Sequence, residues 1–170
     1  IDIGAERTRV CVVRGGKLEY LRSISTGGEA VTHALAKLFD LEPARAREGK
    51  HAEAFIDAGD GARDLPPDVR EIADACREAV KPLVRELRRC LVAHATATGS
   101  PVARAFVCGG GSDLRGLAKY LSGSLGVSVE RLPVNRPELL SLPGFGDVLG
   151  VFANALGAAL RAADVAPSVG

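Results

Sequence analysis

The hydrophobic pattern of the first part of the chain constrains the fold more than any other feature. Residues 8–24 predict two strands around the turn Gly15–Gly16, because a glycine pair suits the two-residue turn of a β-hairpin. With the short apolar run at residues 1–3 they make three consecutive strands. Apolar residues fall on both sides of the first long strand, so we expect both of its faces to be covered.

After these strands the apolar residues recur at helical spacing. The pattern predicts a helix over residues 26–40, and Thr26 and Glu29 have the spacing of a capping box at its start. A second, short helix is expected over residues 42–54.

A long amphipathic helix is predicted over residues 69–97, after a loop at residues 57–68 that is dense in Asp, Gly and Pro. Pro82 lies inside this helix. Because proline removes a backbone donor and crowds the preceding turn, we expect a kink or a break near Val80.

The second half of the chain alternates between strands and helices. Ser112 or Asp113 follows three glycines and is expected to cap a helix there. Three strands in a row followed by βα units predict a mixed α/β sheet with flanking helices, unlike a doubly wound sheet, which alternates from its start. The remaining elements are expected as strands over residues 103–108 and 127–132 and a last helix over residues 147–163.

Charge and composition exclude several classes of protein. Lys and Arg number 22 against 21 Asp and Glu, and aromatic residues make up 4%, so a nucleic-acid partner is not expected. The four cysteines stand singly, which favours buried thiols in a reducing compartment, and the three histidines lack the spacing of metal ligands. No apolar run approaches the roughly 20 residues that a membrane-spanning helix needs.

The first segment with possible chemistry is the turn DIGAERT, from Asp2 to Thr8, between two predicted strands. A glycine there allows the backbone to approach a phosphate closely, and Asp2 could hold a metal through water or orient an attacking water. Alone it also fits an ordinary Asp-Gly turn.

The second such segment is VCGGGSDLRGL, from Val107 to Leu117. Three glycines between a buried strand and a helix would let a phosphorylated ligand lie against the backbone. The segment is not the dinucleotide fingerprint, because Leu114 stands where the third glycine would be. A plain strand-to-helix turn rarely needs three consecutive glycines.

Together, in this order and about a hundred residues apart, the two segments resemble the second half of the actin-like ATPase fold, which is ribonuclease H-like. Actin, the Hsp70 chaperones, sugar kinases and FtsA share that fold. The resemblance implies that the whole chain, residues 1–170, is the second lobe of such a domain, with its core at residues 1–41 and 98–165 and a helical insertion at about residues 42–97. The chain has no Met and begins inside a predicted strand, so we expect a first lobe before Ile1.

A narrower resemblance to the PilM proteins of type IV pilus machines and the GspL proteins of type II secretion lies in residues 20–51. It covers most of the chain, because VCGGGSDLRGLAKYLSGSLGVSVERL and ANALGAALRA look like the same proteins. The general texture of the sequence favours GspL. The residues in register with these families are Arg22, Gly27, Gly28, Thr32 and Lys50.

The resemblance implies a nucleotide site and no catalytic residues. It would place Lys50 near the ribose or adenine, and ATP with Mg is the implied ligand. The family usually has an acidic residue three positions before this lysine, and Arg47 stands there, which leaves ribose recognition open. The implied nucleotide-binding residues are Asp2, Gly4, Thr8, Lys50, Gly109, Gly110 and Gly111.

The function implied by the resemblance is that of a scaffold at the cytoplasmic face of the bacterial inner membrane. It would dock a secretion or pilus assembly ATPase and inner-membrane platform proteins. It would associate with the membrane through these partners or through parts outside this sequence. It would hold ATP without turnover. A dimer is a further expectation. The alternatives are an active ATPase or phosphotransferase of the superfamily and a filament-forming relative such as FtsA.

Overall fold

The computed structural model describes residues 1–57, 65–133, 151–159 and 161. Residues 151–159 form a helix that lies outside the numbered elements. The numbered elements are, in chain order, β1 (Asp2–Ile3), β2 (Thr8–Arg14), β3 (Lys17–Ile24), α1 (Glu29–Phe39), α2 (Pro43–Ala52), α3 (Pro67–Thr98), β4 (Arg104–Val107), the single 3₁₀ turn η1 (Gly110–Asp113), α4 (Leu117–Leu125) and β5 (Ser128–Arg131).

The strands form a mixed sheet. Strands β1, β2 and β3 make an antiparallel meander, as predicted, and β4 pairs with β5 in parallel. A parallel bridge between Asp2 and Cys108 joins the two parts, with the Ile3 amide donating to the Cys108 carbonyl at 2.8 Å. The order across the described sheet is therefore β3-β2-β1-β4-β5, with three antiparallel strands followed by two parallel ones.

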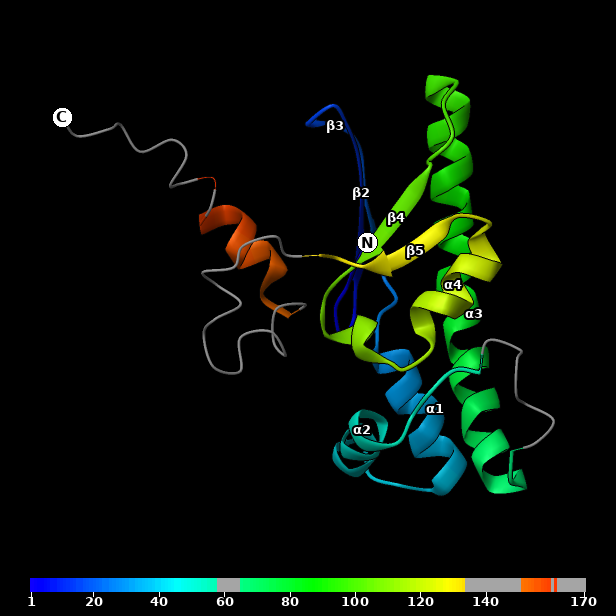
Figure 1. Cartoon of the computed structure of the whole chain (residues 1–170). Coiled ribbons are helices and arrows are strands. Elements are labelled where there is room, and N and C mark those ends of the chain that lie inside the picture. Colours follow the sequence, from blue (N-terminus) through cyan, green and yellow to red (C-terminus); the bar gives the residue numbers. More distant parts are fainter. Residues whose placement is uncertain (58–64, 134–150, 160, 162–170) are drawn as a thin grey trace.

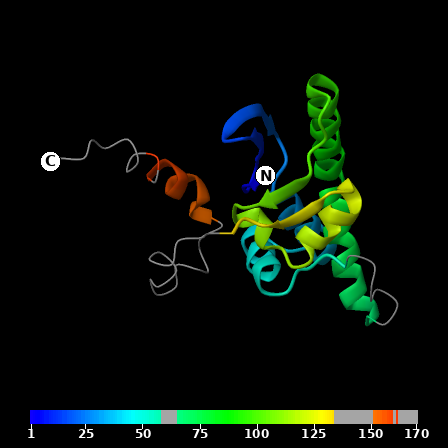
Figure 2. The ribbon, with the colours of Figure 1, turned by 45° about the horizontal axis from the view of Figure 1, so that its top comes forward.

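The helices α1, α3 and α4 lie together on one side of the sheet (Figure 1). Buried side chains of α3, such as Cys76, Leu83 and Leu87, share one core with Ile3, Val10 and the other inward residues of the strands. The helix at residues 151–159 lies on the side away from α3 in both views (Figures 1 and 2). Strands β1, β3 and β4 run in the same direction, so the loops that follow them lie at one end of the sheet.

The helix α3 runs without a break from Pro67 to Thr98, so of the two alternatives expected near Val80, a kink or a break, the break is wrong. Pro82 lies on the solvent-exposed face of α3. The carbonyl that loses its donor can be hydrated there, which lowers the cost of proline inside the helix.

The capping box expected at the start of α1 is also wrong. The helix begins at Glu29 with Gly28 as its N-cap, and no side chain caps it. Thr26 instead lies in the preceding loop, where its carbonyl accepts a 2.7 Å hydrogen bond from the hydroxyl of the buried Thr8. Tertiary contacts of the loop therefore decide where the helix starts.

The expected helix cap after the three glycines is wrong as well. The chain first makes the turn η1, and α4 begins only at Leu117, after Gly116. The Ser112 hydroxyl donates to the carbonyl of Gly109 at 2.7 Å, and Asp113 pairs with Arg131. Neither side chain caps α4.

One face of the β2–β3 hairpin is exposed, contrary to the prediction that both are covered. Val10 is buried against the helices, whereas Val13 is 59% exposed and Cys11 also faces solvent. The helices pack on only one side of this hairpin (Figure 1), so alternate residues stay in water.

Two predicted segments lie partly outside the described residues: residues 58–64 of the loop at 57–68, and the ends of the helix expected over 147–163. The part of that helix that is described, residues 151–159, is helical. None of the helices in the described ranges combines the length and the apolar character needed to cross a membrane.

Candidate functional site

Three loops meet at one end of the sheet. The loop after β1 and the loop after β3 are joined by backbone hydrogen bonds, from the Gly28 amide to the Gly4 carbonyl at 2.9 Å and from the Glu29 amide to the Ala5 carbonyl at 2.7 Å. The third loop, Gly109 to Gly111, follows β4 and lies against Ile3. The strand order brings segments that are far apart in sequence to one place.

The loops approach so closely that side chains are excluded at their contacts. A Cβ added at Gly27 would lie 2.4 Å from the carbonyl oxygen of Gly4. One added at Gly111 would lie 2.5 Å from the side chain of Ile3. Gly109 also has φ +84°, a conformation that other residues rarely adopt. These glycines are therefore needed for the loops to pack.

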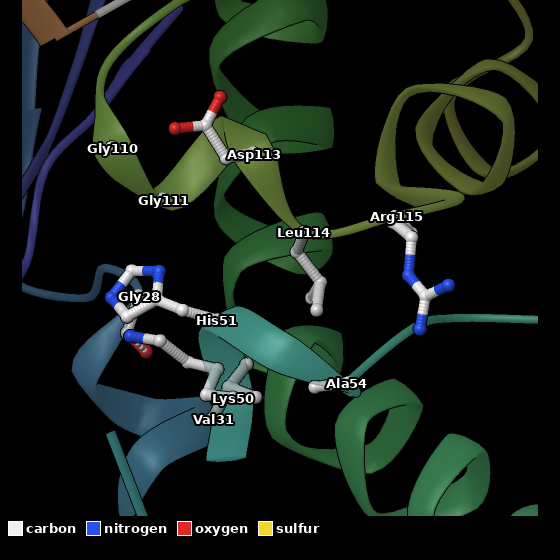
Figure 3. Close-up of a pocket in the computed structure, with 10 residues that line it drawn as sticks. All are labelled: Gly28, Val31, Lys50, His51, Ala54, Gly110, Gly111, Asp113, Leu114 and Arg115. Carbon is white, nitrogen blue, oxygen red and sulfur yellow. Dashed lines mark hydrogen bonds between the residues drawn. The ribbon is translucent and has the colours of Figure 1, made fainter. Parts of the chain in front are cut away.

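A pocket opens beside the packed loops, between α1, α2 and the segment that follows β4 (Figure 3). Backbone of Gly28, Gly110 and Gly111 forms one part of its wall, and side chains of α2 form the opposite part. Its lining residues are Gly28, Val31, Lys50, His51, Ala54, Gly110, Gly111, Asp113, Leu114 and Arg115.

Lys50 reaches the packed loops from α2. Its Nζ donates to the Thr32 hydroxyl at 3.0 Å and to the Gly28 carbonyl at 3.4 Å, which ties α2 to the start of α1. Burial lowers the pKa of Lys50, and the nearby Arg47 lowers it further, whereas Glu29 acts in the opposite direction. An ammonium has three donors, and among the described residues the structure gives acceptors to two of those of Lys50.

Arg47 and Glu29 form an ion pair at the N-terminal end of α1. The Arg47 Nη2 lies 2.8 Å from the Glu29 Oε1. The hydrogen bond from Arg47 is the main reason that the pKa of Glu29 lies below its ordinary value, with Lys50 adding to the effect. Sequence reasoning identified Arg47 as a departure from the family pattern but missed this partner, because the two residues lie on different helices.

The structure brings only some of the predicted site residues to the pocket. Lys50, Gly110 and Gly111 line it. Gly4 and Gly109 lie behind them, in the contacts between the loops. The nucleotide role assigned to these residues stays a prediction.

Thr8 and Asp2 do not line this pocket. The hydroxyl of Thr8 is fully buried and holds the loop after β3. The carboxylate of Asp2 accepts a 2.7 Å hydrogen bond from the Asn154 Nδ2 and lies 3.4 Å from the Arg9 guanidinium. Sequence reasoning missed Asn154, since nothing in the sequence connects residues that far apart.

The polar groups that line the pocket include a lysine, an arginine and the backbone of three glycines. Lys50 and the bare backbone of Gly110 would favour an anionic group such as a phosphate, whereas the first amides of α1 are already bonded to carbonyls of the loops. The Asp113 carboxylate points away from Lys50 in Figure 3, toward its partner Arg131. Within the described ranges, no group of three or more His, Cys, Asp or Glu residues is placed to hold a metal ion.

Comparison with known proteins identifies a family. The profile of the family described as type IV pilus assembly protein PilM matches residues 1–136. Among curated protein sequences, none matches the chain.

Solved structures agree with the family match. A structure of a PilM-PilN type IV pilus biogenesis complex is similar with a TM-score of 0.73 and 32% identity over 94% of this chain. That similarity spans 44% of the other chain, so this chain corresponds to less than half of its relative's length.

More distant structures show the fold alone. The ethanolamine utilization protein EutJ of Carboxydothermus hydrogenoformans has 21% identity and a TM-score of 0.58, over 76% of this chain and 42% of its own. MreB 5 of Spiroplasma citri bound to AMPPNP has 16% identity and a TM-score of 0.59, over 95% of this chain and 54% of its own. The actin-like fold predicted from the two glycine segments is confirmed.

Proposed function

The chain belongs to the family of the type IV pilus assembly protein PilM, and from that premise we propose that it serves as an actin-like scaffold of a pilus assembly platform. The scaffold would work at the cytoplasmic face of the bacterial inner membrane. It would bind a PilN-like platform protein and, through it or directly, the assembly ATPase. The observation that carries this proposal is the 32% identity over 94% of the chain to PilM in its complex with PilN.

Type IV pilus assembly is favoured over type II secretion. The sequence texture favoured GspL, but the matching profile and the most similar of the solved structures cited above are both those of PilM. A gene deletion separates the two machines. We expect loss of surface pili, restored by the wild-type gene, with secretion unchanged. Loss of secretion with normal pili would contradict the assignment.

The scaffold would hold ATP as a structural ligand. Lys50, Gly28 and the loop Gly109 to Gly111 would bind its phosphates or ribose, and the bound nucleotide would supply a bridge of negative charge between the loops and α2. Mg would arrive with the nucleotide. Support comes from the packing of three glycine loops beside a partly buried lysine.

The alternative is an active ATPase or phosphotransferase. Such an enzyme needs a carboxylate free to orient an attacking water. The carboxylate of Asp2 is engaged by Asn154 and lies near Arg9, which favours the scaffold. A phosphate-release assay on the full-length protein decides: repeated turnover above the rate of an Asp2→Asn variant would contradict the scaffold.

Co-purification tests the partner directly. The tagged protein, expressed with the PilN-like protein of the same bacterium, is expected to retain it through size-exclusion chromatography. Failure to retain it while the fold is intact by circular dichroism would contradict the proposed docking role.

A further inference from the structure

The tip of the β2–β3 hairpin combines exposed apolar side chains with unneutralised positive charge. Val13 and Leu18 are 59% and 58% exposed and lie directly opposite each other across the hairpin. Leu21, 62% exposed, lies opposite Cys11 farther along the strands. We call these exposed residues, Cys11, Val13, Leu18 and Leu21, the apolar strip of the hairpin.

The charges at the tip repel one another. Arg14 and Lys17 are paired across the hairpin in the register next to the turn, where like charges destabilise a sheet. Glu19 compensates Arg14 at 3.1 Å. No ion pair joins Lys17 to a carboxylate within the part of the chain that the structure describes. Lys17 therefore gives the tip a positive charge with which an anionic partner would pair.

The tip stands clear of the rest of the fold. A Cβ added at Gly15 or Gly16 would meet no atom within 4 Å. The hairpin projects at the same end as the C-terminal part of α3, away from α1 and α2, which border the pocket (Figures 1 and 2). The apolar strip is thus presented on a convex protrusion.

From these observations we propose that the hairpin tip inserts into the surface of a membrane that contains anionic lipids. Val13 and Leu18 would enter the boundary between headgroups and acyl chains, and Arg14 and Lys17 would contact the phosphates of the headgroups. A convex tip with few apolar residues suits the deformable headgroup region of a membrane better than a protein partner, because a protein would need a groove to receive the tip. Charge complementarity sets the requirement for anionic lipid.

Vesicle co-sedimentation tests this with the full-length protein. The probes are vesicles of phosphatidylglycerol with phosphatidylethanolamine and, for comparison, vesicles of phosphatidylcholine alone. We expect binding to the anionic vesicles, weakened by salt, and little binding to the neutral ones. Removal of one cation by Lys17→Gln is expected to weaken the binding about fivefold.

Matched variants separate insertion of the hairpin tip from nonspecific binding to the vesicles. Val13→Ser is expected to lower binding several-fold, whereas Val92→Ser, which changes an equally exposed valine on α3, is expected to leave it unchanged. Lys37→Gln on α1 is the control for Lys17→Gln, and both lysines are exposed, so folding is not at risk.

Three outcomes overturn the proposal. One is absence of binding to anionic vesicles, and another is equal loss in the test variants and their controls. The third is a dimer, detected by light scattering in the absence of lipid, that Val13→Ser dissociates, since the strip would then pair two copies of the chain through the edge of β3.

Discussion

Gly27 lies against the backbone of Gly4, so that a methyl group on Gly27 would come within 2.4 Å of the Gly4 carbonyl oxygen and 2.5 Å of the Ala5 carbonyl oxygen. Both obstacles are backbone atoms, which cannot rotate away. The loop after β1 and the loop after β3 therefore behave as one unit, and the position of the pocket wall depends on it.

Replacing Gly27 by alanine is expected to destabilise the protein by about 1–3 kcal/mol, the usual cost of overpacking. Gly49→Ala is the matched control. A Cβ at Gly49 meets nothing within 4 Å inside α2, so this change is expected to stabilise by about 0.5–1 kcal/mol through helix propensity. Urea unfolding measures both. Equal free energies of unfolding for the two variants would show that the loops are not in contact.

The Glu29–Arg47 pair gives the stability a defined dependence on pH. Because the folded pKa of Glu29 is depressed, its contribution is present above the unfolded pKa and is lost as the pH falls through the folded pKa. Arg47→Ala is expected to lower the free energy of unfolding at pH 7 by about 0.5–1 kcal/mol, since Arg47 is largely exposed and screened. The deficit relative to the wild type should shrink in acid.

Arg45→Ala is the control for this prediction. Arg45 pairs with Glu48, but both side chains are more than two-thirds exposed, at 76% and 68%, so the change is expected to cost less than Arg47→Ala. The expectation fails if the two variants have the same stability at every pH between 3 and 7.

The order of elements could be predicted from the sequence because it follows from local patterns. The glycine pair at Gly15–Gly16 and the change of hydrophobic period after Ile24 were sufficient for the meander and α1. The close packing of the glycine loops, in contrast, depends on the strand order. The strand order is evident only from the bridge between Asp2 and Cys108, which the sequence pattern does not predict.

Local reasoning was wrong at two helix starts, where other contacts hold the residues that were expected to cap the helices. Thr26 does not cap α1 because its loop is held by Thr8, and Ser112 does not cap α4 because it closes the η1 turn. For the site, Lys50 and the three glycines could be chosen from their family spacing. Glu29 and Asn154 could not, since their partners come from other elements.

The four thiols are expected to differ in reactivity. Cys11 is exposed, whereas Cys76 and Cys90 are fully buried, and burial raises the pKa of Cys76 to about 11. A disulfide reagent at pH 8 should therefore modify Cys11 first and reach Cys76 and Cys90 only when the protein unfolds. Cys11→Ser should remove the fastest phase. A fast phase of unchanged amplitude in this variant would contradict the burial pattern.

The central claim is that the three glycine loops and Lys50 bind a nucleotide. Calorimetric titration of ATP–Mg into the full-length protein tests this claim most directly. We expect saturable binding to the wild type, at least tenfold weaker binding to Lys50→Met, because its charge-assisted contact is lost, and unchanged binding to Lys37→Met. Absence of binding to the wild type, or equal binding by Lys50→Met, would contradict the claim.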